Sequence, residues 1–115
     1  MPKKKDDERL EIHIPRREKR RLAQPVRYVF TDVPEGKAFL TLDGRRLRNL
    51  LELADALDHM DERVFRHHAN GERNDFSNWI RDVMGEQALA DSVRGKDLRG
   101  VQIEVLKHIV KQLKR

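Results

Sequence analysis

Residues 65–85 read FRHHANGERNDFSNWIRDVMG, and this stretch decides most of the predicted fold. Asn74 is a residue type that caps helix N-termini, and Asp75 follows in the first turn, where the helix dipole favours an acidic side chain. Apolar residues then recur at the spacing i, i+3, i+4, i+7, namely Phe76, Trp79, Ile80 and Val83. The stretch therefore predicts a short helix that begins after Asn74, buries the single tryptophan of the chain and ends at Gly85.

Two further helices are predicted toward the N-terminus. Asp61 is expected to cap a short helix that carries Val64 and Phe65 and ends at Asn70-Gly71. Before it, residues 45–60 combine leucines at helical spacing with polar side chains on the opposite face, which predicts an amphipathic helix. Its apolar stripe consists of Leu47, Leu50, Leu51, Ala54 and Leu57.

Two runs rich in β-branched and aromatic residues precede this helix, at residues 26–30 (VRYVF) and 37–42 (KAFLTL). The connector between them contains Pro34 and Gly36, which favour a turn, so the two runs are predicted to pair as a β-hairpin. Asp43-Gly44 is expected to end the second strand.

The C-terminal part predicts a short helix over residues 86–93, a loose linker between Gly95 and Gly100, and a last helix. In the last helix we expect the apolar residues to face inward and the lysines to project away from the core. The residues expected inside are Ile103, Leu106, Ile109, Val110 and Leu113, and the lysines are Lys107, Lys111 and Lys114. Any of these apolar residues left exposed would allow the helix to pair with a second copy.

Together these elements predict an α+β domain that is predominantly α, with an N-terminal β-hairpin packed on four or five short helices. Residues 25–115 are expected to form a single small globular domain, because 115 residues leave no room for a second core. Residues 1–24 are predicted to be a basic, disordered arm. The expected core includes Phe30, Phe39, Leu47, Leu50, Leu57, Phe65, Phe76, Trp79, Ile80, Val83, Leu106 and Val110.

The composition excludes several classes of protein. The absence of cysteine excludes disulfides and thiolate metal sites. No apolar run approaches the roughly 20 residues that a membrane-spanning helix needs, and the basic N-terminus lacks the apolar segment of a signal peptide. We therefore expect a cytoplasmic protein that does not contact a membrane.

Positive charge is concentrated in the arm. Residues 1–24 hold nine Lys and Arg against five Asp and Glu, whereas the rest of the chain holds 16 against 15. Dense basic groups neutralise phosphates and release counterions, so the arm and the basic last helix predict contact with DNA or RNA. The predicted nucleic-acid-binding residues are Lys3, Lys4, Lys5, Arg16, Arg17, Lys19, Arg20, Arg21, Lys107, Lys111 and Lys114. A tail that only aids solubility, or that docks on an acidic protein, stays open.

The neighbouring residues His67 and His68 point about 100° apart on a helix, so they do not chelate one ion together. We expect His68 to face inward and to hydrogen-bond a carboxylate or the backbone. A binding or pH-sensing role is a second interpretation, and a metal ligand is a third. The metal interpretation has the least support, because the sequence contains no HxxxH or HExxH spacing.

Catalytic motifs are absent from the sequence. Ser77 and Ser92 lack a nucleophile motif, and no glycine-rich phosphate loop occurs. We therefore expect no enzymatic activity, no cofactor and no metal.

The pattern Phe65-x-x-His68, followed by Asn74-Asp75-Phe76-x-x-Trp79-Ile80-x-Asp82-Val83, resembles the signature of an uncharacterised prokaryotic family of small domains. Leu42-Asp43-Gly44 and the leucine helix after it match the lead-in of that family. The resemblance covers about residues 28–93, so the arm and the last helix lie outside it. The family has no assigned activity, and its domains occur both alone and attached to larger proteins, so the resemblance implies an accessory or binding role.

Two hypotheses of function follow from the sequence. The first is a non-enzymatic nucleic-acid accessory, in which the arm binds phosphates without reading sequence and the folded body positions the complex. The alternative is a protein-protein interaction adapter. Its predicted partner-binding face consists of His67, His68, Arg73, Asn78 and Arg81.

Overall fold

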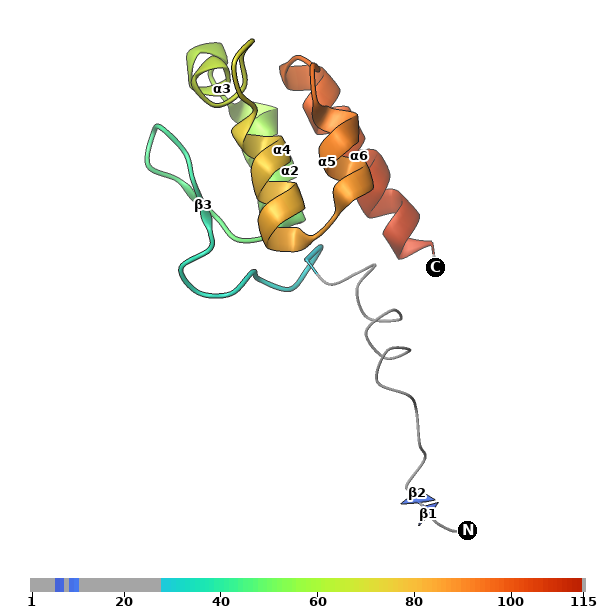
Figure 1. Ribbon diagram of the computed structural model, residues 1–115. Coiled ribbons are helices and arrows are strands. Elements are labelled where there is room, and N and C mark those ends of the chain that lie inside the picture. Colours follow the sequence, from blue (N-terminus) through green and yellow to red (C-terminus); the bar gives the residue numbers. More distant parts are fainter. Residues whose placement is uncertain (1–5, 8, 11–27, 115) are drawn as a thin grey trace.

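The computed structural model describes residues 6–7, 9–10 and 28–114. Near the N-terminus, Asp6–Asp7 (β1) pairs antiparallel with Arg9–Leu10 (β2). The body begins with an antiparallel hairpin of Phe39–Leu40 (β3) and Arg46–Leu47 (β4), and helices follow it (Figure 1). The predicted fold class, α+β and predominantly α with an N-terminal hairpin, is confirmed.

The hairpin turns at Asp43-Gly44. Phe39 lies opposite Leu47, and Leu40 lies opposite Arg46. Gly44 has a φ of 92°, in the left-handed region that favours glycine, and its N–H donates to the Thr41 carbonyl at 2.9 Å. An Asp-Gly pair is a strong hairpin signal. The sequence analysis expected it only to end a strand, whereas in the structure it connects the two strands of the hairpin.

The strand predicted at residues 26–30 is wrong for the residues that the structure describes. Tyr28 and Val29 are buried in a turn, and the Tyr28 carbonyl accepts a hydrogen bond from the Leu50 N–H at 2.8 Å. The described part of this segment therefore forms a turn that bonds to the start of the first body helix. Phe30, expected in the core, is 59% exposed. Val26 and Arg27 lie outside the described residues.

We expect Gly44→Ala to lower the free energy of unfolding by about 1 kcal/mol, because an alanine Cβ is strained at this φ. Gly71→Ala is the matched control, since Gly71 lies in another loop, has no positive φ and has open space around its Cα. Urea unfolding monitored by circular dichroism measures both changes. Equal stabilities of the two variants would contradict the assigned turn.

Side-chain caps begin the next two helices. α2 spans Leu50–His59, and its cap Asn49 accepts from the Glu52 N–H at 2.9 Å. α3 spans Glu62–His68, and the predicted cap Asp61 accepts from the Arg63 N–H at 2.7 Å. Of the predicted stripe, Leu50, Ala54 and Leu57 face the core from α2, whereas Leu51 is 39% exposed. The helix was expected to begin at residue 45 but begins at Leu50, so Leu47 is buried in β4 instead.

α4 spans Asp75–Trp79 and continues into a π-helical turn, η2, at Ile80–Met84. The predicted cap Asn74 is confirmed, because its Oδ1 accepts from the Ser77 N–H at 3.0 Å. Gly85 ends the segment with a φ of 73°, as predicted. Three of the four predicted apolar residues, Phe76, Trp79 and Ile80, are buried, and Val83 is half-buried.

α5 spans Gln87–Val93, close to its predicted position, and α6 spans Leu98–Leu113. Gly100 was expected in a linker but lies inside α6, because Asp97 caps the helix by accepting from the Gly100 N–H at 2.8 Å.

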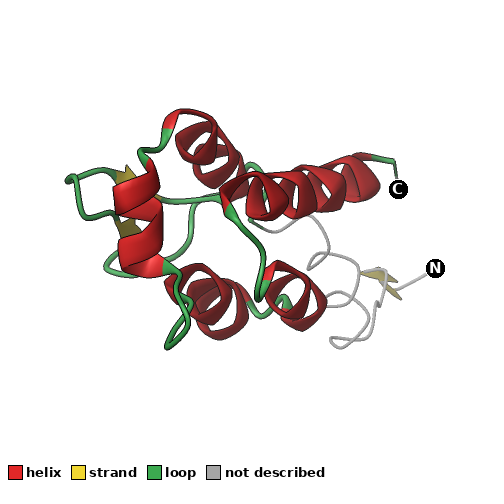
Figure 2. Cartoon of the chain, turned by 90° about the horizontal axis from the view of Figure 1, so that it is seen from above, coloured by secondary structure: helices red, strands yellow, loops and turns green. Residues whose placement is uncertain are grey.

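The helices pack around one core. α6 lies along α2, and α5 packs between α6 and the α4–η2 segment. Figure 1 shows α5 and α6 on one side of the domain and the β3–β4 hairpin on the other, and Figure 2 shows α6 running out to the C-terminus at the edge of the molecule. The fully buried side chains at the centre include Leu47, Leu53, Leu57, Phe76, Ile80, Val93, Val101 and Val105.

Most of the residues that pack α6 on the core are not the predicted ones, although Ile109 is buried as expected. Leu106 and Val110, expected in the core, are 43% and 51% exposed, and Ile103 and Leu113 are 52% and 56% exposed. The buried residues are Leu98, Val101, Gln102, Val105, Ile109 and Gln112. The helix therefore has two apolar faces, and the sequence analysis chose the one without glutamines.

Candidate functional site

His68, at the end of α3, is the centre of a buried polar network. Its ring is 5% exposed and lies edge-on to Phe39 and Phe76, with centroid distances of 5.0 and 5.6 Å. The Leu42 N–H donates to Nε2 at 3.0 Å, so Nε2 carries no proton and Nδ1 carries it. Nδ1 therefore donates to Asp75 Oδ2, also at 3.0 Å, and the imidazole is neutral in this arrangement.

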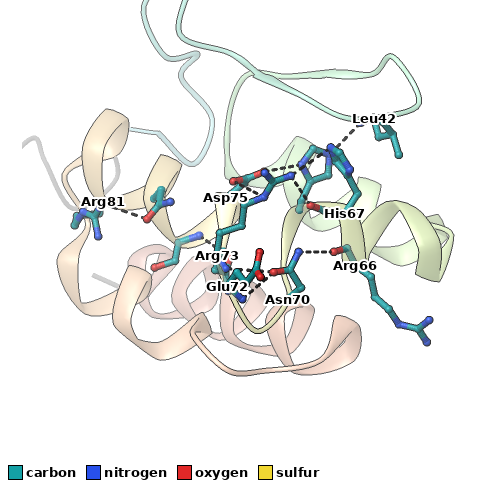
Figure 3. Close-up of polar contacts among 12 residues, drawn as sticks. Leu42, Arg66, His67, Asn70, Glu72, Arg73, Asp75 and Arg81 are labelled. Carbon is teal, nitrogen blue, oxygen red and sulfur yellow. Dashed lines mark hydrogen bonds and ion pairs between the residues drawn. The ribbon is translucent and has the colours of Figure 1, made fainter.

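This network ties together three elements that are far apart in the sequence. Leu42 belongs to the hairpin turn, His68 to α3 and Asp75 to the first turn of α4 (Figure 3). The expectation that His68 faces inward and bonds a carboxylate or the backbone is confirmed, since it bonds both. Because its ring is buried, His68 braces the predicted partner-binding face from within and does not present a contact group itself.

Next to His68, the exposed residues His67 and Arg73 form a polar edge. The Arg73 guanidinium donates to the His67 carbonyl at 2.8 Å and lies 3.6 Å from Asp75 Oδ1. In Figure 3 these side chains gather around Asp75. The arginine is therefore held by the protein itself and stiffens the edge.

The other two residues of that predicted face form a separate group on α4 and η2. Arg81 donates to Asp82 Oδ1 at 2.8 Å and to Asn78 Oδ1 at 3.2 Å. The hydrogen bond to Asp82 raises the pKa of Arg81 and lowers the pKa of Asp82. The charge of Arg81 is thus already compensated, and Figure 3 shows it away from the His67–Arg73 edge.

Trp79 links the same region to the segment before β3. Its Nε1–H donates to the Lys37 carbonyl at 2.8 Å, and its ring lies edge-on to Phe39 at 5.6 Å. The predicted role of Trp79 as a core residue is confirmed, since it is 7% exposed.

A row of large apolar side chains is exposed on α6. We call Ile103, Leu106, Val110 and Leu113 the α6 stripe. Their spacing, i, i+3, i+7, i+10, places them on one side of the helix, and all four are exposed. With Lys107 and Lys111, three of them line a shallow depression of about 360 Å³.

Charged residues of opposite sign border the α6 stripe. On one side lie the exposed residues Lys107, Lys111 and Lys114, which we call the lysine border. On the other side lies α2, whose residues Leu51, Asp55 and Asp58 share one side of that helix and form the α2 border. Asp58 marks the contact between the helices, because its Oδ1 accepts from Gln102 Nε2 at 3.0 Å. That bond, with His59 and Arg99 nearby, lowers the pKa of Asp58.

The sequence analysis named the lysines of this surface and the four residues of the stripe, but it expected the stripe to face the core. The signal of this exposure was present, because the spacing 3-4-3 is that of a coiled-coil seam, which is narrower than the face of a core helix. The arm residues predicted to bind nucleic acid, from Lys3 to Arg21, lie outside the residues whose side chains the structure describes.

Among the described residues, no group of three or more His, Asp or Glu side chains is placed to hold a metal ion. Within the same residues, no helix is long and apolar enough to cross a membrane. Comparison with known proteins found no matching family model, no matching curated protein and no matching solved structure.

Proposed function

We propose that this chain is a non-enzymatic protein-interaction module that binds its partner through the α6 stripe. The observation that supports the proposal is the exposure of four large apolar side chains in one row on a well-formed helix. Single exposed apolar residues are common, but a contiguous apolar patch with a polar rim is typical of a protein contact surface. The seam spacing favours a helix as the bound element.

The rest of the structure suits this role. α2 and α5 hold the buried face of α6 from two sides, so the stripe is presented on a rigid support. A rigid apolar surface loses little conformational entropy on binding. The module also has a polar surface, the His67–Arg73 edge, which the buried His68 network supports from within.

The size of the complex formed in cells tests the proposal. A tagged full chain in an extract of the cells that naturally make it should elute from a sizing column as a species larger than the 13.6 kDa chain. Val110→Glu should shift it to the size of the free chain, because a charge in the stripe cannot be buried against a partner.

Leu40→Glu is the matched control, since Leu40 is 61% exposed but lies in β3, away from α6. It should elute like the unchanged chain. Identical elution of the unchanged chain and Val110→Glu would refute the role of the stripe.

A second candidate function, nucleic-acid binding through the basic arm, is supported by the concentration of positive charge in residues 1–24 and by the exposed lysine border. Such binding should weaken steeply with salt, because each phosphate contact releases counterions.

We expect fluorescence anisotropy to show salt-dependent binding of the full chain to duplex DNA or single-stranded RNA. Removal of residues 1–24 should abolish most of the affinity and flatten the salt dependence. Binding that is unchanged without the arm would refute this candidate, and Val110→Glu should leave it intact.

A further inference from the structure

We propose that the partner that covers the α6 stripe is a second copy of this chain, bound by parallel, twofold-symmetric pairing of two α6 helices. The inference rests on the proposed function, because it names the occupant of the same surface.

The residue types of the stripe favour two parallel helices. Ile103 and Val110 occupy the first apolar position of the seven-residue repeat, and Leu106 and Leu113 occupy the second. In a parallel arrangement, β-branched residues at the first position with leucine at the second favour two helices over three or four, because these shapes fill the spaces between two helices in register.

The charges beside the stripe distinguish the two possible directions of pairing. In an antiparallel pair the lysine border of one copy meets the lysine border of the other, and opposed like charges disfavour association. In a parallel pair each side of the helix meets the opposite side of its partner. The lysine border of each copy then faces the α2 border of the other.

Acidic residues of the α2 border and basic residues of the lysine border lie at similar levels along α6. Asp58 lies beside Gln102, and α2 runs antiparallel to α6, since Asp58 near the end of α2 also meets Arg99 near the start of α6. Asp55, three residues earlier in α2, therefore lies near the level of Val105, less than one turn from Lys107. Asp55 already holds a loose exposed pair with Arg45 at 3.6 Å, and Lys107 of a second copy would give it another cation.

The stripe alone is too small for a specific interface, so the contact must also include the α2 border. The stripe is 11 residues long from Ile103 to Leu113, and a helix pair of that length buries less than the roughly 1,200 Å² of a specific interface. The half-exposed Leu51 and the alkyl stems of the lysines extend the apolar surface beyond the stripe in the parallel arrangement. The parallel pair therefore covers more surface than the stripe alone.

Sedimentation equilibrium of the purified full chain at tens of micromolar tests the inference. We expect a mass of twice 13.6 kDa for the unchanged chain and for Leu40→Glu, and a mass of 13.6 kDa for Val110→Glu. Circular dichroism establishes that each variant is folded.

A charge swap tests the direction of pairing with folded proteins. Lys107→Glu should raise the dissociation constant of the pair about tenfold, since it faces Asp55 of the second copy, and adding Asp55→Lys should restore it. An unchanged constant for Lys107→Glu, or no recovery in the double variant, would overturn the parallel arrangement.

A monomeric unchanged chain at every concentration would overturn self-pairing. The proposed function would then be judged separately by the sizing experiment in extract, where a Val110-dependent complex shows that a different protein occupies the stripe. A dimer that survives Val110→Glu would show that the two copies use another surface, which also overturns the inference.

Discussion

Replacing His68 by alanine should lower the free energy of unfolding by about 3 kcal/mol, whereas the same change at the neighbouring His67 should alter it by less than about 0.5 kcal/mol. The two residues have the same side chain and adjacent places in α3, so intrinsic helix propensity does not separate them. Their environments do. His68 is buried and His67 is exposed.

Three losses contribute to the effect at His68. The ring leaves a cavity between Phe39 and Phe76, the Leu42 N–H loses its acceptor, and Asp75 loses its donor. Partly buried polar groups left without partners cost about 1 to 3 kcal/mol. At His67 the groups that hold Arg73 are mainly backbone, since the arginine donates to the His67 carbonyl at 2.8 Å, and alanine keeps that carbonyl.

Urea unfolding at neutral pH measures both variants. Equal destabilisation by the two alanines would show that His68 does not brace the hairpin against α3 and α4. Val105 and Val110 of α6 provide a second comparison between a buried and an exposed residue of the same type.

Val105→Glu should destabilise the domain by roughly 4 kcal/mol or more, while Val110→Glu should leave the stability of the single copy within about 0.5 kcal/mol. Val105 is fully buried and Val110 is 51% exposed, although the two valines are five residues apart in one helix. A glutamate at 105 is a buried charge without a partner. A glutamate at 110 remains in water.

Because small domains are stable by only about 5 to 15 kcal/mol, Val105→Glu is expected to be largely unfolded under mild heating. Thermal unfolding followed by circular dichroism, at protein concentrations low enough to keep the copies apart, gives both values. A greater loss of stability at 110 than at 105 would mean that α6 packs through the opposite face, which would remove the proposed surface.

Local sequence signals predicted the parts of the fold that depend on few residues. Asp61 and Asn74 were identified as caps from their residue type and position, and the structure places both side chains in cap hydrogen bonds. The inward orientation of His68 was also predicted, since two adjacent histidines on a helix point about 100° apart and can have different surroundings.

The errors concern choices between two physically similar alternatives. The sequence offers Phe39–Leu40 two possible strand partners, residues 26–30 and Arg46–Leu47, and the tight Asp43-Gly44 turn favours the nearer one. α6 has two apolar faces, and the one with fewer polar residues was expected inside. The other face packs against α2, where Gln102 forms a hydrogen bond to Asp58. Neither contact is visible from periodicity within one element.

The π-helical turn at Ile80–Met84 had no signal in the sequence pattern, because its residues repeat the same apolar spacing as α4. The exposure of the α6 stripe could have been predicted from the sequence. A seam at the spacing 3-4-3 beside a second apolar face indicates a helix that serves both a core and a partner.

Site-specific photocrosslinking in cells tests the claim that the α6 stripe is a protein contact surface most directly. A photoreactive side chain placed at Leu106 should join the chain covalently to another protein, and the same group at Leu42, which is more exposed, should not. Val110→Glu in the same chain should abolish the product at position 106. Our account predicts that pattern, with a product of twice the mass of the chain if the partner is a second copy. A position 106 that crosslinks no more than position 42 would contradict it.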